Sequence, residues 1–285
     1  MSDSDSDHHD DDHVYLTLAE GHDDGSDARW AFGTGFEDPL YGVDTIVPEG
    51  VDAGELATTC VELADDALVS AQRLAEWCTR APELEEEVAL ANIGLDLLGQ
   101  ARLLYARAGQ VDGTGRDEDA YAYFRDAGDF RNVRLAELPI GDFAFSVVRL
   151  LMLSSWRLAH FERLANHRDP VLAAIAAKGA KELTYHRQYA AEWAVRLGDG
   201  TDESRRRMRT ALDQVAPYLG ELFAACDVQG EVVEVLRQVT AVAGLPMPQV
   251  RPASGAGRDG QHTEHLAPLL AELQSVARAH PEATW

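Results

Sequence analysis

The sequence predicts an all-α protein, in which one helical bundle with additional helices follows an irregular acidic N-terminal arm. From about Glu55 onward, apolar residues recur with the period of 3.6 residues that is typical of amphipathic helices. No segment alternates apolar and polar residues as a half-buried strand would. Long helices joined by short connections form antiparallel bundles, so four major helices with smaller ones around them are expected.

The chain divides by composition into residues 1–50 and residues 51–285. The opening tract SDSDSDHHDDDH is acidic and of low complexity, and it cannot bury enough apolar surface to fold alone. Glycines, prolines and aromatic residues from Trp30 to Pro48 indicate an irregular arm that lies against the body or a partner. His8, His9 and His13 are weak candidate metal ligands, but a solvated tail is the simpler interpretation. We therefore expect one helical domain, residues 51–285, with an N-terminal extension.

The first two long helices are predicted at about Glu55–Cys78 and Glu83–Ala108. Pro82 introduces the second, because proline is tolerated in the first turn of a helix. Gly94 and Gly99 interrupt this second helix, and each lowers helix propensity by about 1 kcal/mol relative to alanine. We expect these small residues to let a neighbouring helix approach closely.

The remaining helices follow a glycine-rich loop. Asp169 and Pro170 supply an N-cap and a first-turn proline for the fourth long helix, and Gly198 and Gly200 end it. The predicted segments are a short helix at Asp119–Phe124, then Phe143–Asn166, Pro170–Leu197, Thr201 or Asp202 to Ala225, Glu231–Ala243 and Ala267–Ala279.

The charge balance restricts the partners of the chain. With 49 acidic and 25 basic residues, the formal net charge of -24 repels nucleic-acid phosphates and anionic membranes. No run of about 18 apolar residues predicts a membrane span, and no apolar stretch near the start resembles a signal peptide, so a cytoplasmic location is expected. Lysine occurs only at Lys178 and Lys181, and this composition is typical of halophilic proteins. An ordinary acidic cytosolic protein is the alternative.

A helical bundle raises the question of a di-iron carboxylate centre. Such a centre takes one carboxylate from each of two helices and a Glu-x-x-His pair from each of the other two. None of the histidines has a glutamate three residues before it; Arg157, for example, precedes His160 at this spacing. The sequence therefore lacks the motif.

What remains of such a site is an incomplete set. In the second helix the motif position reads Asp96-x-x-Gly99, and glycine has no side chain to bind a metal. In the fourth helix it reads Glu182-x-x-Tyr185, with a histidine one residue further on. Two irons held by these residues would be badly undercoordinated, so we predict no metal in this chain. The members of the degenerate site are Asp65 in the first helix, Asp96, Gly99, Glu182, Tyr185 and His186.

Buried carboxylates without a metal need another source of stabilisation. We expect a network of salt bridges or hydrogen bonds, with arginines such as Arg73, Arg102 and Arg187 as partners. The alternative is a metal-dependent oxidase with an unconventional site, in which Glu182 and His186 act as residual ligands. Stoichiometric iron in the purified chain would favour this alternative.

Other chemistries have weaker support. The sequence contains no dinucleotide-binding, P-loop, H-E-x-x-H or G-x-S-x-G motif. His262, Glu264 and His265 resemble a ligand trio, but polar residues at a helix entrance are the simpler interpretation. A third possibility is a free-standing helical protein that binds an acyl-CoA. The four arginines within Arg205–Arg209 would help to bind its phosphates, although their spacing suggests a solvated helix face.

Several segments together resemble the C subunits of phenylacetyl-CoA epoxidases. The resemblance covers about Leu56 to Trp285 and is loose between Gln229 and Arg251. Its most specific blocks are SAQRLAEWCTRAPELEEEVALANIGLDLLGQARLL from Ser70, FRDAGDFRNVRLAELPIGDFAF from Phe124, RLANHRDPVLAAIAAKGAKELTYHRQYAAEW from Arg163, RLGDGTDESRRRM from Arg196 and GRDGQHTEHLAPLLAELQSVARAHPEATW from Gly257.

The resemblance implies a ferritin-like fold and a non-catalytic structural role. Members of this family pair with a homologous catalytic A subunit that holds a di-iron centre and the CoA ester, and a separate reductase subunit supplies electrons. No cofactor and no catalytic residue are then expected in this chain. We further expect the second and third long helices, with Trp77 or Trp156, to contribute to the interface, and assembly to weaken at low salt.

Overall fold

The computed structural model describes residues 40, 42–252 and 254–283. Within this range it contains helices and no strands, which confirms the all-α prediction. Residues from Gly42 onward form one compact unit, which is the body described below. The predictions for His8, His9, His13 and most of the N-terminal arm lie outside the described residues.

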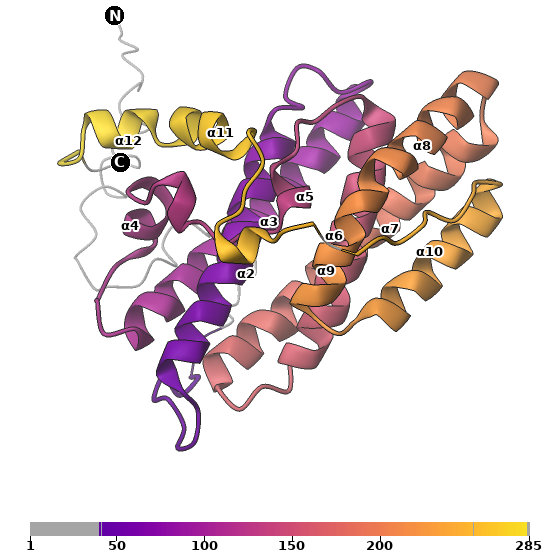
Figure 1. Cartoon of the computed structure of the whole chain (residues 1–285). Coiled ribbons are helices and arrows are strands. Elements are labelled where there is room, and N and C mark those ends of the chain that lie inside the picture. Colours follow the sequence, from indigo (N-terminus) through magenta and orange to yellow (C-terminus); the bar gives the residue numbers. More distant parts are fainter. Residues whose placement is uncertain (1–39, 41, 253, 284–285) are drawn as a thin grey trace, which may run out of the picture. The chain divides into compact units, whose positions relative to one another are not determined.

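Four long helices form the bundle (Figure 1). They are α2 (Ala53–Ala75), α3 (Leu84–Val111), α6 (Phe143–Leu164) and α7 (Pro170–Asp199). Helix α2 packs mainly against α3, α6 packs mainly against α7, and α3 also contacts α7. All four lie within a few residues of the predicted bounds.

Aspartate N-caps explain where three of these helices begin. The side chain of Asp52 accepts a hydrogen bond from the backbone N–H of Glu55, and Asp142 caps α6 in the same way. Asp169 accepts from the backbone of Leu172, with Pro170 in the first turn. Each cap satisfies an N–H that has no partner inside the helix, so these starts follow from local sequence.

Shorter helices surround the bundle. They are α4 (Glu118–Tyr123), α5 (Arg134–Glu137), α8 (Asp202–Val215), α9 (Leu219–Ala225), α10 (Gln229–Ala243), α11 (Leu266–Leu273) and α12 (Ser275–Ala279).

The prediction and the structure differ at three places among these helices. The predicted fifth helix is two helices, because a 3-10 turn containing Pro217 interrupts it. The last helix is interrupted at Gln274, whose amide donates to the carbonyls of Ala122 and Arg125. Helix α5 was not predicted. Among the described residues, no helix is both long and apolar enough to cross a membrane.

Helix α6 is almost entirely buried in the body, because α8 and α10 pack against it in addition to α7. Trp156 is 1% exposed and Trp77 is 5% exposed. The indole N–H of Trp77 donates to Ser146 within the core. The expectation that α6 and these tryptophans contribute to a partner interface is therefore wrong.

The glycines of the bundle have different environments. A Cβ on Gly94 would lie 3.6 Å from the carbonyl oxygen of Ala71 in α2, an ordinary van der Waals contact, so α2 lies against α3 there without requiring a glycine. A Cβ on Gly99 would meet nothing within 4 Å, so no other described helix of this chain approaches closely at Gly99. At Gly179 in α7, a Cβ would lie only 2.6 Å from the ring of Phe161. Helices α6 and α7 approach closely at that point.

Candidate functional site

A buried arginine links the four long helices beside the degenerate site predicted from the sequence. Arg157 of α6 donates from Nε to the side-chain carbonyl of Gln100 in α3, at 3.0 Å, and from Nη1 to the backbone carbonyl of Leu63 in α2, at 2.9 Å. Gln100 in turn donates to Glu182 of α7, at 2.9 Å. The Arg157 network is our name for Leu63, Gln100, Arg157 and Glu182, and it has a member in every helix of the bundle.

Glu182 has a second partner at the edge of this network. Its other carboxylate oxygen lies 2.8 Å from Nζ of Lys178, one turn earlier in α7. The Glu182 side chain is only 17% exposed. Both oxygens of this carboxylate are therefore engaged by side chains of the protein.

Asp96 and His186 form a separate bridge between α3 and α7. Nε2 of His186 lies 2.9 Å from Oδ2 of Asp96. The imidazole is 2% exposed, whereas the aspartate side chain is 44% exposed. The structure thus brings together three predicted members, because Glu182 lies one turn from His186 on the same helix.

Asp65 belongs to a different cluster. Its carboxylate accepts hydrogen bonds from the Tyr105 hydroxyl, the Arg125 guanidinium and the backbone N–H of Arg131. Burial, followed by the neighbouring Asp65 charge, raises the pKa of Tyr105 well above its ordinary value. The predicted grouping of Asp65 with Asp96 is not formed.

Asp66, rather than Asp65, faces the cavity beside Arg157 and His186. It lines a cavity of about 30 Å³ together with Arg157 and His186. Its oxygens accept from Arg258, at 2.6 and 3.0 Å, and from the backbone N–H of Val133, at 2.8 Å. Adjacent residues on a helix point about 100° apart, and the apolar period alone did not distinguish Asp65 from Asp66.

Two other expectations about this site need correction. Tyr185 is 72% exposed, so its side chain lies on the surface rather than in the bundle. Among the arginines expected to stabilise buried carboxylates, Arg73 pairs with Glu76 and Arg102 pairs with Glu118. A network of salt bridges and hydrogen bonds is present, as predicted from the sequence. Its principal arginine is Arg157, which the prediction did not include.

The chemistry of these residues does not fit a di-iron centre. Burial lowers the pKa of Arg157 to about 10, so the guanidinium remains protonated at neutral pH. A buried cation raises the energy of any metal ion beside it. The carboxylates of Asp65 and Asp66 are paired with arginines, and both motif histidines are absent. Too few free anionic ligands remain for two iron ions.

One further acidic group has metal-like spacing. Across the described part of the chain, Glu83, Glu85 and Glu86 are the residues whose ligand atoms all lie within 4.8 Å of one another. They stand at the N-terminal end of α3, where negative charge is favourable beside the helix dipole, and no histidine or cysteine joins them.

The other predicted clusters have structural partners. His262 bonds to Glu137, at 3.0 Å, and to the carbonyl of Phe130, at 2.9 Å. Glu264 is a surface residue with an 88% exposed side chain, so the trio with His265 does not converge on a buried point. On α8, Arg206 and Arg207 pair with Glu203 at the surface, as expected for a solvated helix face.

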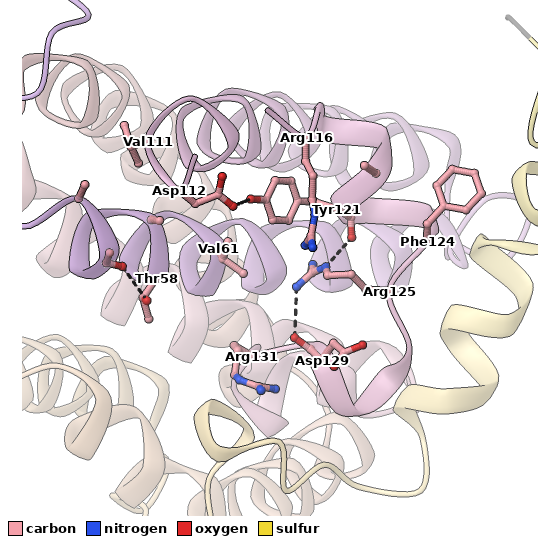
Figure 2. Close-up of a pocket in the computed structure, with 14 residues that line it drawn as sticks. Thr58, Val61, Val111, Asp112, Arg116, Tyr121, Phe124, Arg125, Asp129 and Arg131 are labelled. Carbon is pink, nitrogen blue, oxygen red and sulfur yellow. Dashed lines mark hydrogen bonds between the residues drawn. The ribbon is translucent and has the colours of Figure 1, made fainter. Parts of the chain in front are cut away.

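An open groove lies between the start of α2, the end of α3 and α4 (Figure 2). Its volume is about 940 Å³. Arg116 and Arg125 point toward each other across it, and the Tyr121 hydroxyl donates to Asp112. Asp65, which does not line the groove, pairs with Arg125, whereas Asp112 and Asp129 line the groove itself. The arginine charges are therefore balanced, and no histidine or cysteine lines this groove.

Comparison with known proteins identifies the family of the chain. Residues 50–285 match the family model described as phenylacetic acid catabolic protein. The chain is 42% identical over 247 residues to the C subunit of 1,2-phenylacetyl-CoA epoxidase from Escherichia coli (strain K12), and the match covers 81% of this chain and 99% of that protein. The helical fold is the ferritin-like fold of the family. The chain therefore belongs to the phenylacetic acid catabolic protein family and is a homologue of that E. coli protein.

Proposed function

We propose that this chain is a non-catalytic structural subunit of a phenylacetyl-CoA epoxidase, and that it pairs with a catalytic A subunit in phenylacetate degradation. The Arg157 network carries the proposal. A guanidinium, an amide and a carboxylate link the helices that hold metal ligands in di-iron bundles. The name of the E. coli relative supports the assignment to such a complex.

The network supplies the rigidity that metal ions give a catalytic bundle. Hydrogen bonds to charged groups contribute roughly 1.5–3 kcal/mol each to stability when their partners are well placed. Arg157 also lies 4.4 Å from the ring centroid of Phe161, a cation–π contact within α6. The bundle thus holds its shape through its own side chains, and the di-iron centre of the complex is assigned to the A subunit.

The second candidate function is a metal-dependent oxidase that uses Asp96, Glu182 and His186. The observation in its favour is that these three residues lie on facing helices, with Asp96 already bonded to His186. Against it, Glu182 is engaged by Gln100 and Lys178, and Asp65 is bound to Arg125.

Turnover by the reconstituted complex separates the two functions. Glu182→Gln and His186→Asn should each leave epoxidation of phenylacetyl-CoA per assembled complex within about twofold of wild type, because neither residue binds the reacting metal. Omission of this chain should abolish the activity, since the A subunit loses its structural partner. A loss of about 100-fold in either assembled variant would overturn the structural role.

A further inference from the structure

Helix α3 presents a row of apolar side chains to solvent. Leu84 is 71% exposed, Val88 51%, Leu95 64% and Leu98 38%. Their spacings of four, seven and three residues place them on one face of the helix. The row, which we call the α3 stripe, extends about 21 Å along the helix. Exposed apolar residues that form a contiguous row mark an interaction surface more often than isolated ones do.

Helix α7 exposes a tyrosine near this row. Tyr185 is 72% exposed and precedes His186, whose ring bonds to Asp96 of α3. The tyrosine therefore lies at the same level as Leu95 and Leu98. By contrast, α6 is covered by α7, α8 and α10 within the chain.

Gly99 supplies an independent observation. A glycine in the middle of a helix is unfavourable by about 1 kcal/mol relative to alanine. No atom within 4 Å of its missing Cβ explains the glycine by packing inside the chain. Gly99 follows Leu98 directly, beside the α3 stripe. A surface without a side chain at this point allows a partner helix to approach the α3 backbone closely.

The negative charge of the chain favours a partner with basic residues. Glu83, Glu85 and Glu86 gather their carboxylates within 4.8 Å at the N-terminal end of the stripe. A second copy of this chain would bring another net charge of -24 to the contact, and self-repulsion opposes that association. A partner with an apolar helix face bordered by arginine or lysine complements both features.

We infer that the α3 stripe, with Gly99 and Tyr185, is the surface on which this chain binds another subunit of the epoxidase. This inference rests on the proposed function and adds the location and chemistry of the contact. The occupant is a helix of the partner subunit that packs on Leu95 and Leu98, with basic residues opposite Glu85 and Glu86.

Affinity measurements with the full-length chain and the other purified subunits of the same epoxidase test the inference. Leu95→Glu with Leu98→Glu, and separately Gly99→Leu, should weaken binding by at least about 100-fold, because each places charge or bulk in the contact. Glu85→Lys with Glu86→Lys should weaken binding about tenfold or more. The matched control is Val242→Glu, since Val242 is an apolar residue of α10 that is 70% exposed outside this surface.

Thermal unfolding of each isolated variant shows that the chain remains folded. Gly99→Leu is decisive, because it should leave the unfolding temperature of the isolated chain unchanged or raise it while it weakens the complex. If wild type binds and all stripe variants bind equally well, the location is wrong and the proposed function stands. If wild type binds no other subunit, the proposed function itself fails. A wild-type homodimer that Leu95→Glu dissociates would assign this surface to a second copy and overturn the inference.

Discussion

At the scale of single residues, Arg157 separates this chain from a metal-binding bundle. Its guanidinium links α6 to α3 directly and to α7 through Gln100. A cation held by the protein itself repels metal cations, and it donates hydrogen bonds to the side-chain carbonyl of Gln100 and the backbone carbonyl of Leu63. The same residue thus links the long helices and supports the proposed absence of a metal centre.

Arg157→Met should destabilise the isolated chain by about 2–4 kcal/mol. The substitution retains apolar bulk but leaves Gln100 and the carbonyl of Leu63 without their buried partner. Urea unfolding at fixed salt measures the effect, with the surface variant Arg209→Met as the control. A change below about 0.5 kcal/mol would show that the network does not stabilise the bundle.

His160 should make stability depend on pH. Burial, and then the charge of Arg157, lowers the pKa of His160 to about 4. Since the unfolded chain binds this proton near the ordinary pKa of about 6.5, stability should fall as pH falls from about 6.5 to 4, by at most about 1.4 kcal/mol per pH unit.

Urea unfolding of wild type and His160→Gln at several pH values isolates this contribution. The variant should lose less stability than wild type between pH 7 and pH 5, whereas the exposed-site control His280→Gln should follow wild type. Parallel pH profiles for wild type and His160→Gln would contradict the assignment.

At the scale of elements, local sequence signals predicted where the long helices lie. Contacts between distant segments determine which side chains of each helix are buried. Caps such as Asp169 and the apolar period depend on a few neighbouring residues, so the helix bounds were close. The burial of Trp156 depends on how distant segments cover α6. The choice between Asp65 and Asp66 depends on loops that reach them from elsewhere in the chain, including the one with Arg258. No local pattern encodes these contacts.

Two glycine-to-alanine variants test this view of the packing. Gly99→Ala should stabilise the isolated chain by up to about 1 kcal/mol, because open space surrounds the new methyl group. Gly179→Ala should destabilise it by about 1–3 kcal/mol, because the methyl group would lie 2.6 Å from Phe161. Thermal or urea unfolding compares them, and effects of equal sign would refute the packing described for α7.

At the scale of the whole molecule, the net charge determines how the proposed assembly should respond to salt. A formal net charge of -24 predicts that association strengthens as salt screens repulsion between carboxylates. A halophilic source stays a prediction of the composition. Both predictions rest on the composition of the whole sequence, whereas the Arg157 network and the α3 stripe belong to the residues that the structure describes.

The iron content of the purified chain, alone and co-expressed with the A subunit in high salt, tests the central claim most directly. Metal analysis with a parallel mass measurement gives both stoichiometry and assembly state. A structural role predicts no stoichiometric iron in the isolated chain and an iron-containing complex when the A subunit is present. About two iron ions per isolated chain, the complement of a di-iron bundle, would contradict it.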